Sequence, residues 1–416
     1  MKYHLRFMDK SLKKRLRSFG AVLIEGTKGC GKTETAKQAA ESVARLDVDE
    51  NIRIQMEIDP SNILQGATPR LIDEWPEYPQ IWNYIRHEVD ERQKKGQFIL
   101  TGSATPNDKF RRHSGAGRFS ILTMRPMSLF ERGWSTGEVS LTELMRGLPP
   151  CSENVDFDLG ELAEKISLGG WPGLIRERNV SGRQFAKDYI SLIAEVDLNR
   201  VSEKRRDPNK IKRLLQSLAR NISTEATITS LTKDVRGYTG SFNDETAAQY
   251  LENLERLKVY EKLPAWNIQI RSAASLRKSP KHHFVDPSLA VGALDLSVDK
   301  LLADLKYLGL LFKSLAIRDL RILSESIGGD VFHYRDSTGL EVDAIIECGD
   351  GTWGAFEIKL GMGSVPEAAK NLLKLADKVK SDHPKNPATL TVITGNGFAH
   401  SRKDGVNVAP LSTLTE

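Results

Sequence analysis

The sequence predicts an α/β fold whose N-terminal part is a parallel sheet built around a phosphate-binding loop. Three observations predict it: an apolar run, a glycine-rich loop directly after that run, and a helical segment directly after the loop. The run Gly20–Glu25 is typical of a buried parallel strand, the loop is Gly26–Thr33, and the helix is expected over Thr33–Ala40. Because a phosphate-binding loop needs a strand before it and a helix after it, this context supports the interpretation.

The loop reads Gly-Thr-Lys-Gly-Cys-Gly-Lys-Thr, which is the P-loop pattern. Its glycines let the backbone wrap an anion and present N–H groups to phosphate. Lys32 is expected to reach the β- and γ-phosphates of ATP, and the Thr33 hydroxyl is expected to bind Mg²⁺. The predicted nucleotide-binding residues are Gly26, Thr27, Lys28, Gly29, Cys30, Gly31, Lys32 and Thr33.

Length and composition limit the classes of protein to which this chain can belong. At 416 residues, the chain is long enough for roughly three domains. A formal charge of +5 is mildly basic, which permits a nucleic-acid partner without requiring one. The basic residues 1–18 are followed by no apolar signal-peptide core, and no apolar stretch approaches about 18 residues, so a cytoplasmic location without a membrane partner is expected. Cys30, Cys151 and Cys348 lie too far apart to form a disulfide framework or a metal cluster.

The next segments predict more of the sheet. Asn51–Ile58 alternates polar and apolar residues and predicts a strand, and Gln80–Lys95 predicts a helix with one apolar face. Between them, Pro69–Trp75 holds an apolar run that ends in two acids, the Walker B pattern. Asp73 is expected to hold Mg²⁺, and Glu74 is expected to orient and polarise the attacking water. The alternative is an ordinary acidic pair at the end of a strand.

Polar residues follow the apolar strand predicted over Gln97–Ala104. They stand at its C-terminal end, where open α/β sheets bind ligands, so Ser103 or Thr101 is a candidate sensor of the γ-phosphate. The alternative is that these hydroxyls cap the following turn. Arg118, just before a strand predicted over Phe119–Met124, is a candidate arginine finger for a neighbouring subunit; the alternative is an ordinary solvated arginine.

Together these segments resemble a family of bacterial AAA-type ATPases whose C-terminal part is a domain of unknown function. The matching segments reach almost to the C-terminus: 20–26, 71–75, 100–103, 114–118, 170–173, 279–287, 309–312 and 341–343. The resemblance implies an AAA-type P-loop core, a helical lid, a winged-helix module and a C-terminal domain similar to PD-(D/E)XK restriction endonucleases. It implies no known substrate. The corresponding domains are expected at 1–135, 136–205, 206–290 and 291–416.

The middle of the chain has a winged-helix outline. Three amphipathic segments, 211–222, 228–236 and 243–259, precede an extended stretch, 266–284. The stretch carries basic residues that are candidates for contact with DNA phosphates, namely Arg271, Arg277, Lys278, Lys281, His282 and His283. The third segment, however, carries acids that repel DNA unless they face away, so packing or protein contact stays open as the alternative.

The C-terminal part predicts a second candidate catalytic site on a hairpin. If the turn between strands 341–347 and 352–360 spans Gly349–Gly351, Asp343 lies opposite Glu357, with Lys359 on the same face. A two-residue turn would instead set Asp343 against Ile358. Two carboxylates and a lysine are the arrangement of a Mg²⁺-dependent nuclease. Where such domains often have a further helical acid, the predicted helix 306–326 offers Lys313, which favours an internal counter-ion over a metal.

Three functions remain open from the sequence. The first is a Mg²⁺-dependent ATPase that couples its nucleotide state to DNA or protein binding, with a homo-oligomer as a candidate assembly. The second is an ATP-regulated nuclease that uses Asp343, Glu357 and Lys359. The third is a nucleotide-gated scaffold that hydrolyses ATP slowly.

Overall fold

The computed structural model describes residues 3–102, 114–155, 158–175, 182–201, 206–239, 242–268, 279–380 and 383–416. The chain divides into two compact units. The first comprises Met1–Pro126, Asp197–Arg205 and Glu252–Val259, and the second comprises Met127–Val196, Arg206–Leu251 and Tyr260–Glu416. The finer division into four domains remains a prediction. Among the described residues, no helix is long and apolar enough to cross a membrane.

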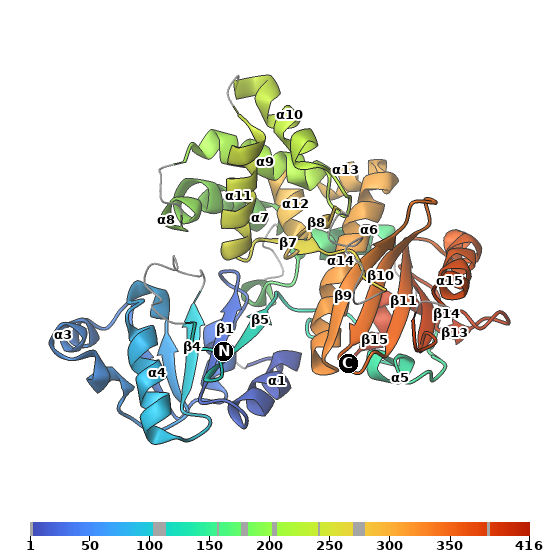
Figure 1. Cartoon of the computed structure of the whole chain (residues 1–416). Coiled ribbons are helices and arrows are strands. Elements are labelled where there is room, and N and C mark those ends of the chain that lie inside the picture. The colour runs from blue at the N-terminus through green and yellow to red at the C-terminus, as the bar shows by residue number, and fades with distance from the viewer. Residues whose placement is uncertain are drawn as a thin grey trace. The chain divides into compact units, whose positions relative to one another are not determined.

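The first unit is built on a five-stranded sheet whose neighbouring strands all run parallel, in the order β2-β3-β4-β1-β5 (Figure 1). The strands are β1 (Ala21–Gly26), β2 (Ser42–Arg45), β3 (Arg70–Asp73), β4 (Phe98–Gly102) and β5 (Phe119–Met124). The helices are α1 (Phe7–Leu16), α2 (Lys32–Lys37), α3 (Glu50–Ile58), α4 (Ile81–Arg92) and α8 (Leu198–Val201). Four of these strands, β1, β3, β4 and β5, lie in segments for which the sequence predicts strands.

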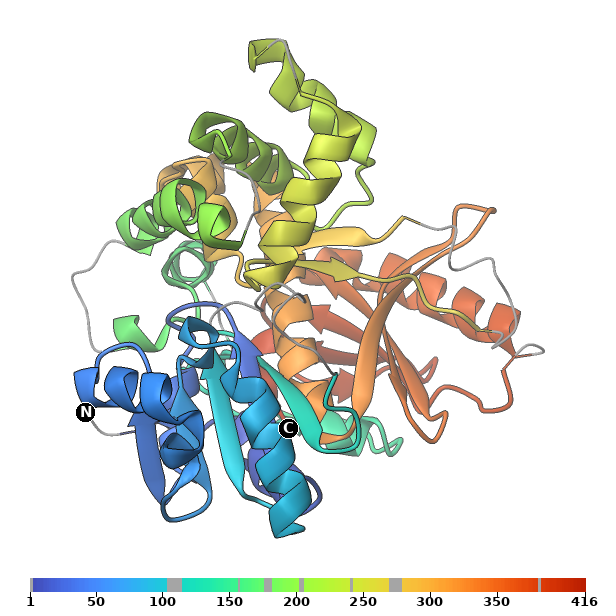
Figure 2. The ribbon, with the colours of Figure 1, turned by 60° about the vertical axis from the view of Figure 1, so that its left-hand side comes forward.

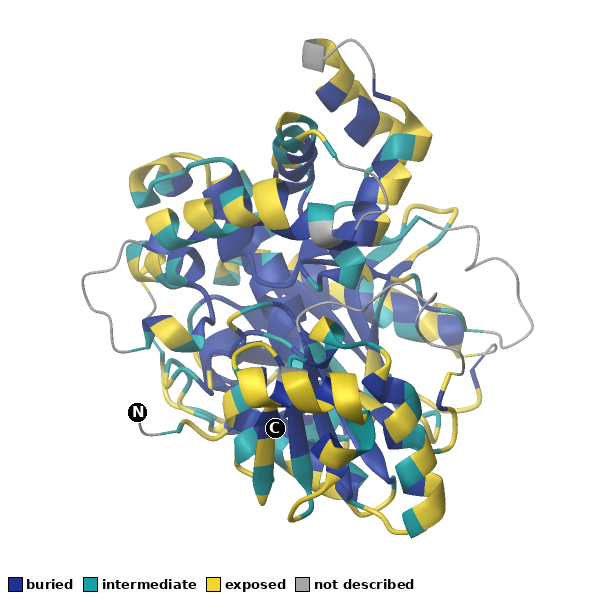
Figure 3. Cartoon of the chain, turned by 90° about the vertical axis from the view of Figure 1, so that its left-hand side faces the viewer, coloured by how far each residue is buried: buried dark blue, intermediate teal, exposed yellow. Residues whose placement is uncertain are grey.

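Helices cover both faces of this sheet, because the side chains of each strand alternate between the faces. From β1, Ala21 and Leu23 pack with α3 and α4, whereas Val22 and Ile24 pack with α1 and α2. Figure 3 shows much of the sheet in dark blue and exposed residues in yellow on the outer sides of the helices, while the edge strand β2 has both buried and exposed residues. The apolar run before the loop is therefore buried on both sides, as a central parallel strand requires.

The prediction of a strand over Asn51–Ile58 is wrong, because this segment forms α3. Ile52 and Met56, four residues apart, are buried, while Ile54 is 56% exposed. An alternating apolar pattern always contains such i, i+4 pairs, so it also fits one face of a helix. The Asp49 carboxylate accepts a hydrogen bond from the Asn51 N–H at 3.0 Å and caps the helix. The strand of this region is β2, which lies earlier in the chain.

The second unit contains more helices and a second, mixed sheet. Its helices are α5 (Leu141–Leu144), α6 (Leu159–Leu168), α7 (Gly182–Leu192), α9 (Pro208–Arg220), α10 (Ile228–Thr239), α12 (Ser288–Ala293), α13 (Val298–Ala303), α14 (Leu305–Ser326) and α15 (Val365–Val379). A π-helical turn, η5 (Ile193–Asp197), follows α7, and α11 (Asp244–Arg256) contributes its first half. Short 3-10 turns η1 (Pro60–Leu64), η2 (Trp75–Glu77), η4 (Pro172–Leu174), η7 (Met362–Ser364) and η8 (Leu411–Thr413) occur along the whole chain.

The mixed sheet has the strand order β13-β14-β12-β11-β10-β9 and appears in orange and red in Figure 2. Its strands are β9 (Gly329–Arg335), β10 (Glu341–Cys348), β11 (Trp353–Lys359), β12 (Thr389–Thr394), β13 (His400–Ser401) and β14 (Asn407–Pro410). The helix α15 packs its apolar side on one face of it. Two small pairs complete the unit: β7 (Tyr260–Leu263) with β8 (Lys281–Phe284), and β6 (Val139–Ser140) with β15 (Leu414–Thr415).

A buried ionic cluster joins distant segments within the second unit. The Arg318 guanidinium on α14 lies 2.6 Å from Asp286 and 2.8 Å from Asp319, and all three side chains are almost fully buried. Asp286 also accepts the Gly170 N–H at 2.9 Å, and Asp319 accepts the Leu129 N–H at 2.8 Å. The cluster therefore ties α14 to the chain around residues 129, 170 and 286. Residues 170 and 286 belong to two of the segments that carry the family resemblance.

We expect Arg318→Met to destabilise the protein by about 3 to 5 kcal/mol, because it leaves two buried carboxylates without their cation. Chemical denaturation followed by circular dichroism measures this. The control is Arg183→Met, which removes an exposed ion pair with Asp295 and should leave the unfolding midpoint nearly unchanged. Equal midpoints for the two variants would contradict a structural role for the cluster.

Candidate active site

The P-loop connects β1 to α2 and needs glycine at several positions. Gly29 and Gly31 have φ of 73° and 104°, in the left-handed region that favours glycine. At Gly26, a Cβ atom would lie 2.3 Å from the Met124 carbonyl oxygen, so no larger residue fits there. The helix after the loop is shorter than expected, since α2 ends at Lys37.

Lys32 is buried, and its ammonium group lies inside the loop. Its Nζ donates to the carbonyl oxygens of Gly26 and Thr27, both at 2.9 Å. An ammonium group carries three donors, so contact with a phosphate oxygen requires only a small movement of this flexible side chain. Backbone N–H groups of a glycine-rich loop, with an ammonium group held among them, fit the triphosphate of a nucleotide.

The Asp73 carboxylate lies at the centre of the site. Its Oδ1 accepts a hydrogen bond from the Thr33 hydroxyl at 2.9 Å and another from the Thr101 hydroxyl at 2.5 Å. The strand order explains this meeting, because β4 lies between β1 and β3 and all three strands end at the same edge. A hydroxyl and a carboxylate oxygen are ligands that Mg²⁺ accepts beside phosphate and water, so these residues fit the metal.

Glu74 follows Asp73 in a strained backbone conformation. Its φ of 52° is left-handed, which is uncommon for a residue other than glycine and is often found at functional sites. Burial raises the pKa of the Glu74 carboxyl, and the Asp73 and Asp47 carboxylates add to this against the opposing charges of Lys32 and Lys28. A carboxylate that holds a proton more tightly than usual is a better general base.

The predicted site residues Ser103 and Arg118 are not part of the described site. Ser103 lies outside the described residues, whereas Thr101, the alternative, contacts Asp73. Arg118 precedes β5, and the parallel register of β1 and β5 puts it at the edge opposite the P-loop, about 17 Å away along the strands. Its Nε donates to Asp90 at 2.6 Å. Arg118 is therefore excluded as an arginine finger for the P-loop of its own chain.

The sequence analysis did not identify several charged residues that contact the P-loop or the residue just before it. Lys28 forms an ion pair with Asp197, and Glu25 forms one with Lys258 at 2.8 Å. A third contact comes from Arg6, whose guanidinium donates to the Cys30 carbonyl at 2.9 Å. All of these residues belong to the first unit but are remote in sequence. No local pattern could have identified them, because an isolated charged residue carries no spacing signal.

The predicted hairpin site does converge in the second unit. The β10–β11 register pairs Ala344 with Phe356, and one step further it sets Asp343 against Glu357, as predicted. Both carboxyl groups are almost fully buried. The Lys359 ammonium group lies 2.8 Å from Glu357, and that of Lys313 lies 2.5 Å from Asp343. Each of the two carboxylates, Asp343 and Glu357, therefore has a lysine ammonium group as its neighbour.

The charges of this site are mutually compensated. Burial by itself would raise the pKa of Asp343, but the ammonium groups of Lys313, Lys281 and Lys359 hold it below its usual range. Burial, and then the Asp343 charge, raise the pKa of Glu357 to about 8. Among the described residues there is no group of three or more His, Cys, Asp or Glu side chains that could hold a metal.

The basic stretch predicted to contact DNA is only partly described. Arg271, Arg277 and Lys278 lie outside the described residues. The remaining three are buried, which argues against phosphate contact. Lys281 pairs with Glu341 at 2.5 Å, His282 bonds to Tyr260, and His283 lies 3.1 Å from the Ser314 hydroxyl. Burial lowers the pKa of both histidines, so they are neutral near pH 7.

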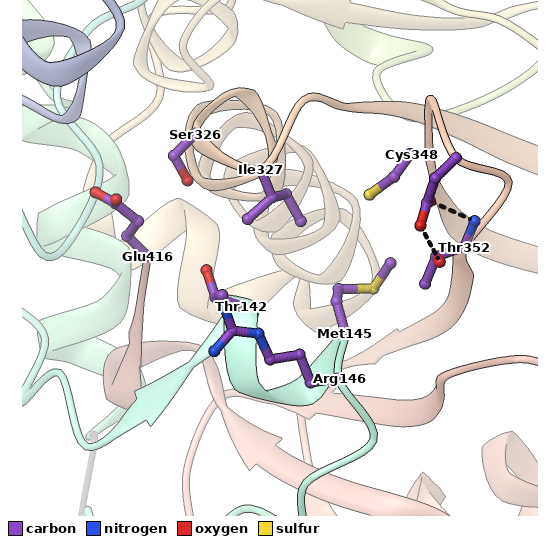
Figure 4. A pocket seen from close by; sticks show the side chains of 9 residues that line it. Thr142, Met145, Arg146, Ser326, Ile327, Cys348, Thr352 and Glu416 are labelled. Atoms are coloured by element: carbon purple, nitrogen blue, oxygen red, sulfur yellow. Dashed lines mark hydrogen bonds between the residues drawn. The ribbon is translucent and has the colours of Figure 1, made fainter. Parts of the chain in front are cut away.

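A shallow hollow of about 520 Å³ lies between α5, the end of α14 and the β10–β11 turn (Figure 4). Arg146, Met145, Ile327 and Cys348 are among its lining residues. Burial, followed by the nearby Asp350 charge, raises the pKa of the Cys348 thiol, so the thiol is not activated as a nucleophile. The described lining carries carboxylates, among them Asp350, whose charge disfavours the thiolate, and it therefore supports no catalytic assignment.

Comparison with protein families divides the chain into three parts. Residues 18–132 match the AAA domain family, so this part is similar to AAA-type P-loop ATPase domains. Residues 159–300 match a domain of unknown function, DUF8612, and residues 308–414 match another, DUF4143. Among curated proteins, no match was found.

Solved structures give only distant likenesses. The Walker-type ATPase PABY2304 of Pyrococcus abyssi is 14% identical, with a TM-score of 0.41 over 69% of this chain and 94% of its own. A protein described as a DNA replication initiation factor is 16% identical, with a TM-score of 0.21 over 59% of this chain and 85% of its own. At these TM-scores, neither likeness carries an argument about function.

The raised pKa of Glu74 predicts how the rate of ATP hydrolysis depends on pH. A general base works only when it is ionised, and the raised pKa of Glu74 moves its ionisation to higher pH. The rate of ATP hydrolysis should therefore rise with pH, and this rising limb of the pH–rate profile should lie above the ordinary glutamate pKa of 4.5. Rates at saturating ATP across pH measure this limb. Glu74→Gln should remove it, whereas Glu77→Gln, at an exposed neighbour, should keep it. A limb that survives in Glu74→Gln would assign the ionisation to another group.

Proposed function

We propose that the protein is a Mg²⁺-dependent, ATP-hydrolysing AAA-type ATPase. The observation that carries the proposal is the meeting of Thr33 and Asp73 at 2.9 Å beside the buried ammonium group of Lys32. These groups are the phosphate-binding and metal-binding parts that phosphoryl transfer to water requires. The match of residues 18–132 to the AAA domain family supports the same activity.

Each residue has a separate role in this proposal. The loop N–H groups and Lys32 bind and orient the phosphates, and Lys32 offsets the charge that develops on them. Thr33 and Asp73 hold Mg²⁺, which supplies charge stabilisation at the phosphate oxygens when bound. Glu74 orients a water molecule and accepts its proton at a carboxylate oxygen. Thr101 holds the Asp73 carboxylate in place through its hydroxyl.

The nucleotide state is proposed to control binding of DNA or protein by the C-terminal parts. Three helices, α9, α10 and α11, followed by the antiparallel pair β7–β8, support a winged-helix module within 206–290. Because Lys281, His282 and His283 are buried, the described part of this module favours protein contact over DNA contact. Arg118, at the sheet edge opposite the P-loop, suits action on a neighbouring copy in a homo-oligomer.

Two alternatives are weaker. An ATP-regulated nuclease of the PD-(D/E)XK type would use Asp343, Glu357 and Lys359, but the Lys313 ammonium group lies at hydrogen-bond distance from the Asp343 oxygen that a metal would need. This contact favours an internal counter-ion. A nucleotide-gated scaffold with slow hydrolysis would use the same P-loop residues, and only the measured turnover separates it from the main proposal.

For the ATPase, we expect Lys32→Ala to weaken ATP binding roughly 10- to 100-fold, because it removes a charge-assisted contact to phosphate. Glu74→Gln should bind ATP like wild type and lose about 10²- to 10⁴-fold in kcat, because only the base is lost. Calorimetry and phosphate release measure the two effects. Lys37→Ala, on the same short helix but paired with Glu34, is the control. Full turnover by Lys32→Ala would refute the proposal.

For the hairpin, we expect wild type to bind no Mn²⁺ there and Lys313→Glu to gain a Mn²⁺ site. The substitution replaces a cation with the third carboxylate that oxygen coordination needs. A Mn²⁺ titration followed by electron paramagnetic resonance, without added nucleotide and in a Lys32→Ala background that weakens nucleotide binding, measures the gain. Lys306→Glu makes the same charge change at an exposed position of α14 and serves as control. Mg²⁺-dependent plasmid cleavage by wild type would instead establish the nuclease.

A further inference from the structure

A buried arginine from the N-terminal segment lies against the P-loop. Arg6 precedes α1 and is 7% exposed. Its Nη1 donates to the Cys30 carbonyl oxygen at 2.9 Å, and its Nη2 donates to the Arg125 carbonyl oxygen at 2.8 Å. One guanidinium therefore links the phosphate-binding loop to the chain just after β5.

The same segment also contacts the helix after the loop. The Tyr3 hydroxyl donates to Asp9 at 2.7 Å and lies 2.8 Å from the Thr35 hydroxyl on α2. The Arg6 N–H donates to the other Asp9 oxygen at 2.9 Å. Tyr3, Arg6 and Asp9 thus form one connected group that touches both the P-loop and α2. The position of Arg6 is fixed by this group rather than by the loop alone.

The contact with Cys30 controls the direction of one backbone donor. In a planar trans peptide, the carbonyl and the N–H of the next residue point in opposite directions. Holding the Cys30 carbonyl toward Arg6 therefore turns the Gly31 N–H away from Arg6. The flanking glycines, Gly29 and Gly31, have positive φ and adopt many conformations easily, so this peptide would rotate readily without an outside contact.

We propose that Arg6 is a positioning residue of the P-loop, which holds the Cys30–Gly31 peptide so that the Gly31 N–H faces the nucleotide phosphates. This rests on the proposed ATPase function. The planar guanidinium suits the role because its fork of donors reaches two carbonyl groups at once, and a lysine ammonium is a single point of charge. A positive charge behind the loop also favours an anion in front of it.

The thiol of Cys30 provides a test that does not depend on activity. Cys30 is buried within the loop, whereas Cys151 is exposed and Cys348 is half-buried. In a Cys151→Ser, Cys348→Ser background, the rate of alkylation by N-ethylmaleimide without nucleotide reports how well the loop is held. Arg6→Met should raise that rate about tenfold or more and weaken ATP binding about tenfold. Arg6→Lys should fall between Arg6→Met and wild type in both measurements.

The control is Arg15→Met, which removes the same charge from α1 and breaks a contact with Ser120 instead of the P-loop. It should leave alkylation and ATP affinity unchanged. Unfolding midpoints of all variants show whether a change is local, and Arg6→Gln replaces Arg6→Met if the latter fails to fold.

The outcomes separate the two proposals. If wild type does not bind ATP, the proposed function fails, while the alkylation rates still decide whether Arg6 holds the loop. If Arg6→Met alkylates no faster than wild type, the positioning role is refuted. Faster alkylation with unchanged ATP affinity also refutes it, because the held peptide would then not serve phosphate binding.

Discussion

The candidate active site depends on one carboxylate, that of Asp73, which accepts hydrogen bonds from Thr33 and Thr101. A buried carboxylate is costly unless donors satisfy it, and here the donors come from the P-loop helix and the neighbouring strand. Thr33 links the P-loop directly to Asp73, and Thr101 on β4, the strand between β1 and β3, adds a second hydrogen bond. The P-loop and the Walker B motif are thereby held together within a single parallel sheet.

The same rule for buried charge explains the two polar clusters of the second unit. At Arg318, one guanidinium serves two carboxylates and several backbone N–H groups complete the hydrogen bonding. At the β10–β11 hairpin, lysines from three elements compensate Asp343 and its neighbours. In both places the cations come from this chain itself. The hairpin resembles a metal site in its acids but differs from one in the groups that neutralise them.

Sequence patterns predicted four of the five strands of the first sheet, missed β2, and misassigned one segment. The Gly20–Glu25 run, the Walker B run and the strand 119–124 were all identified, because a buried parallel strand is apolar on both faces. The segment Asn51–Ile58 was misassigned, because its alternation also fits a helix and the capping by Asp49 was overlooked. The hairpin register around Asp343 and Glu357 was predicted correctly from the position of a turn that contains Gly349 and Gly351.

By itself, the sequence determined the elements whose chemistry is local: the P-loop between a strand and a helix, the acids that end β3, and the hairpin that pairs Asp343 with Glu357. Motif spacing and alternation suffice for these, since neighbouring residues define them. Only the tertiary structure decided that Arg118 lies at the edge opposite the P-loop, that Thr101 bonds Asp73, and that Arg6 holds Cys30. The physical reason is that strand order and buried charge pairing join residues far apart in the chain, and no short segment records those contacts.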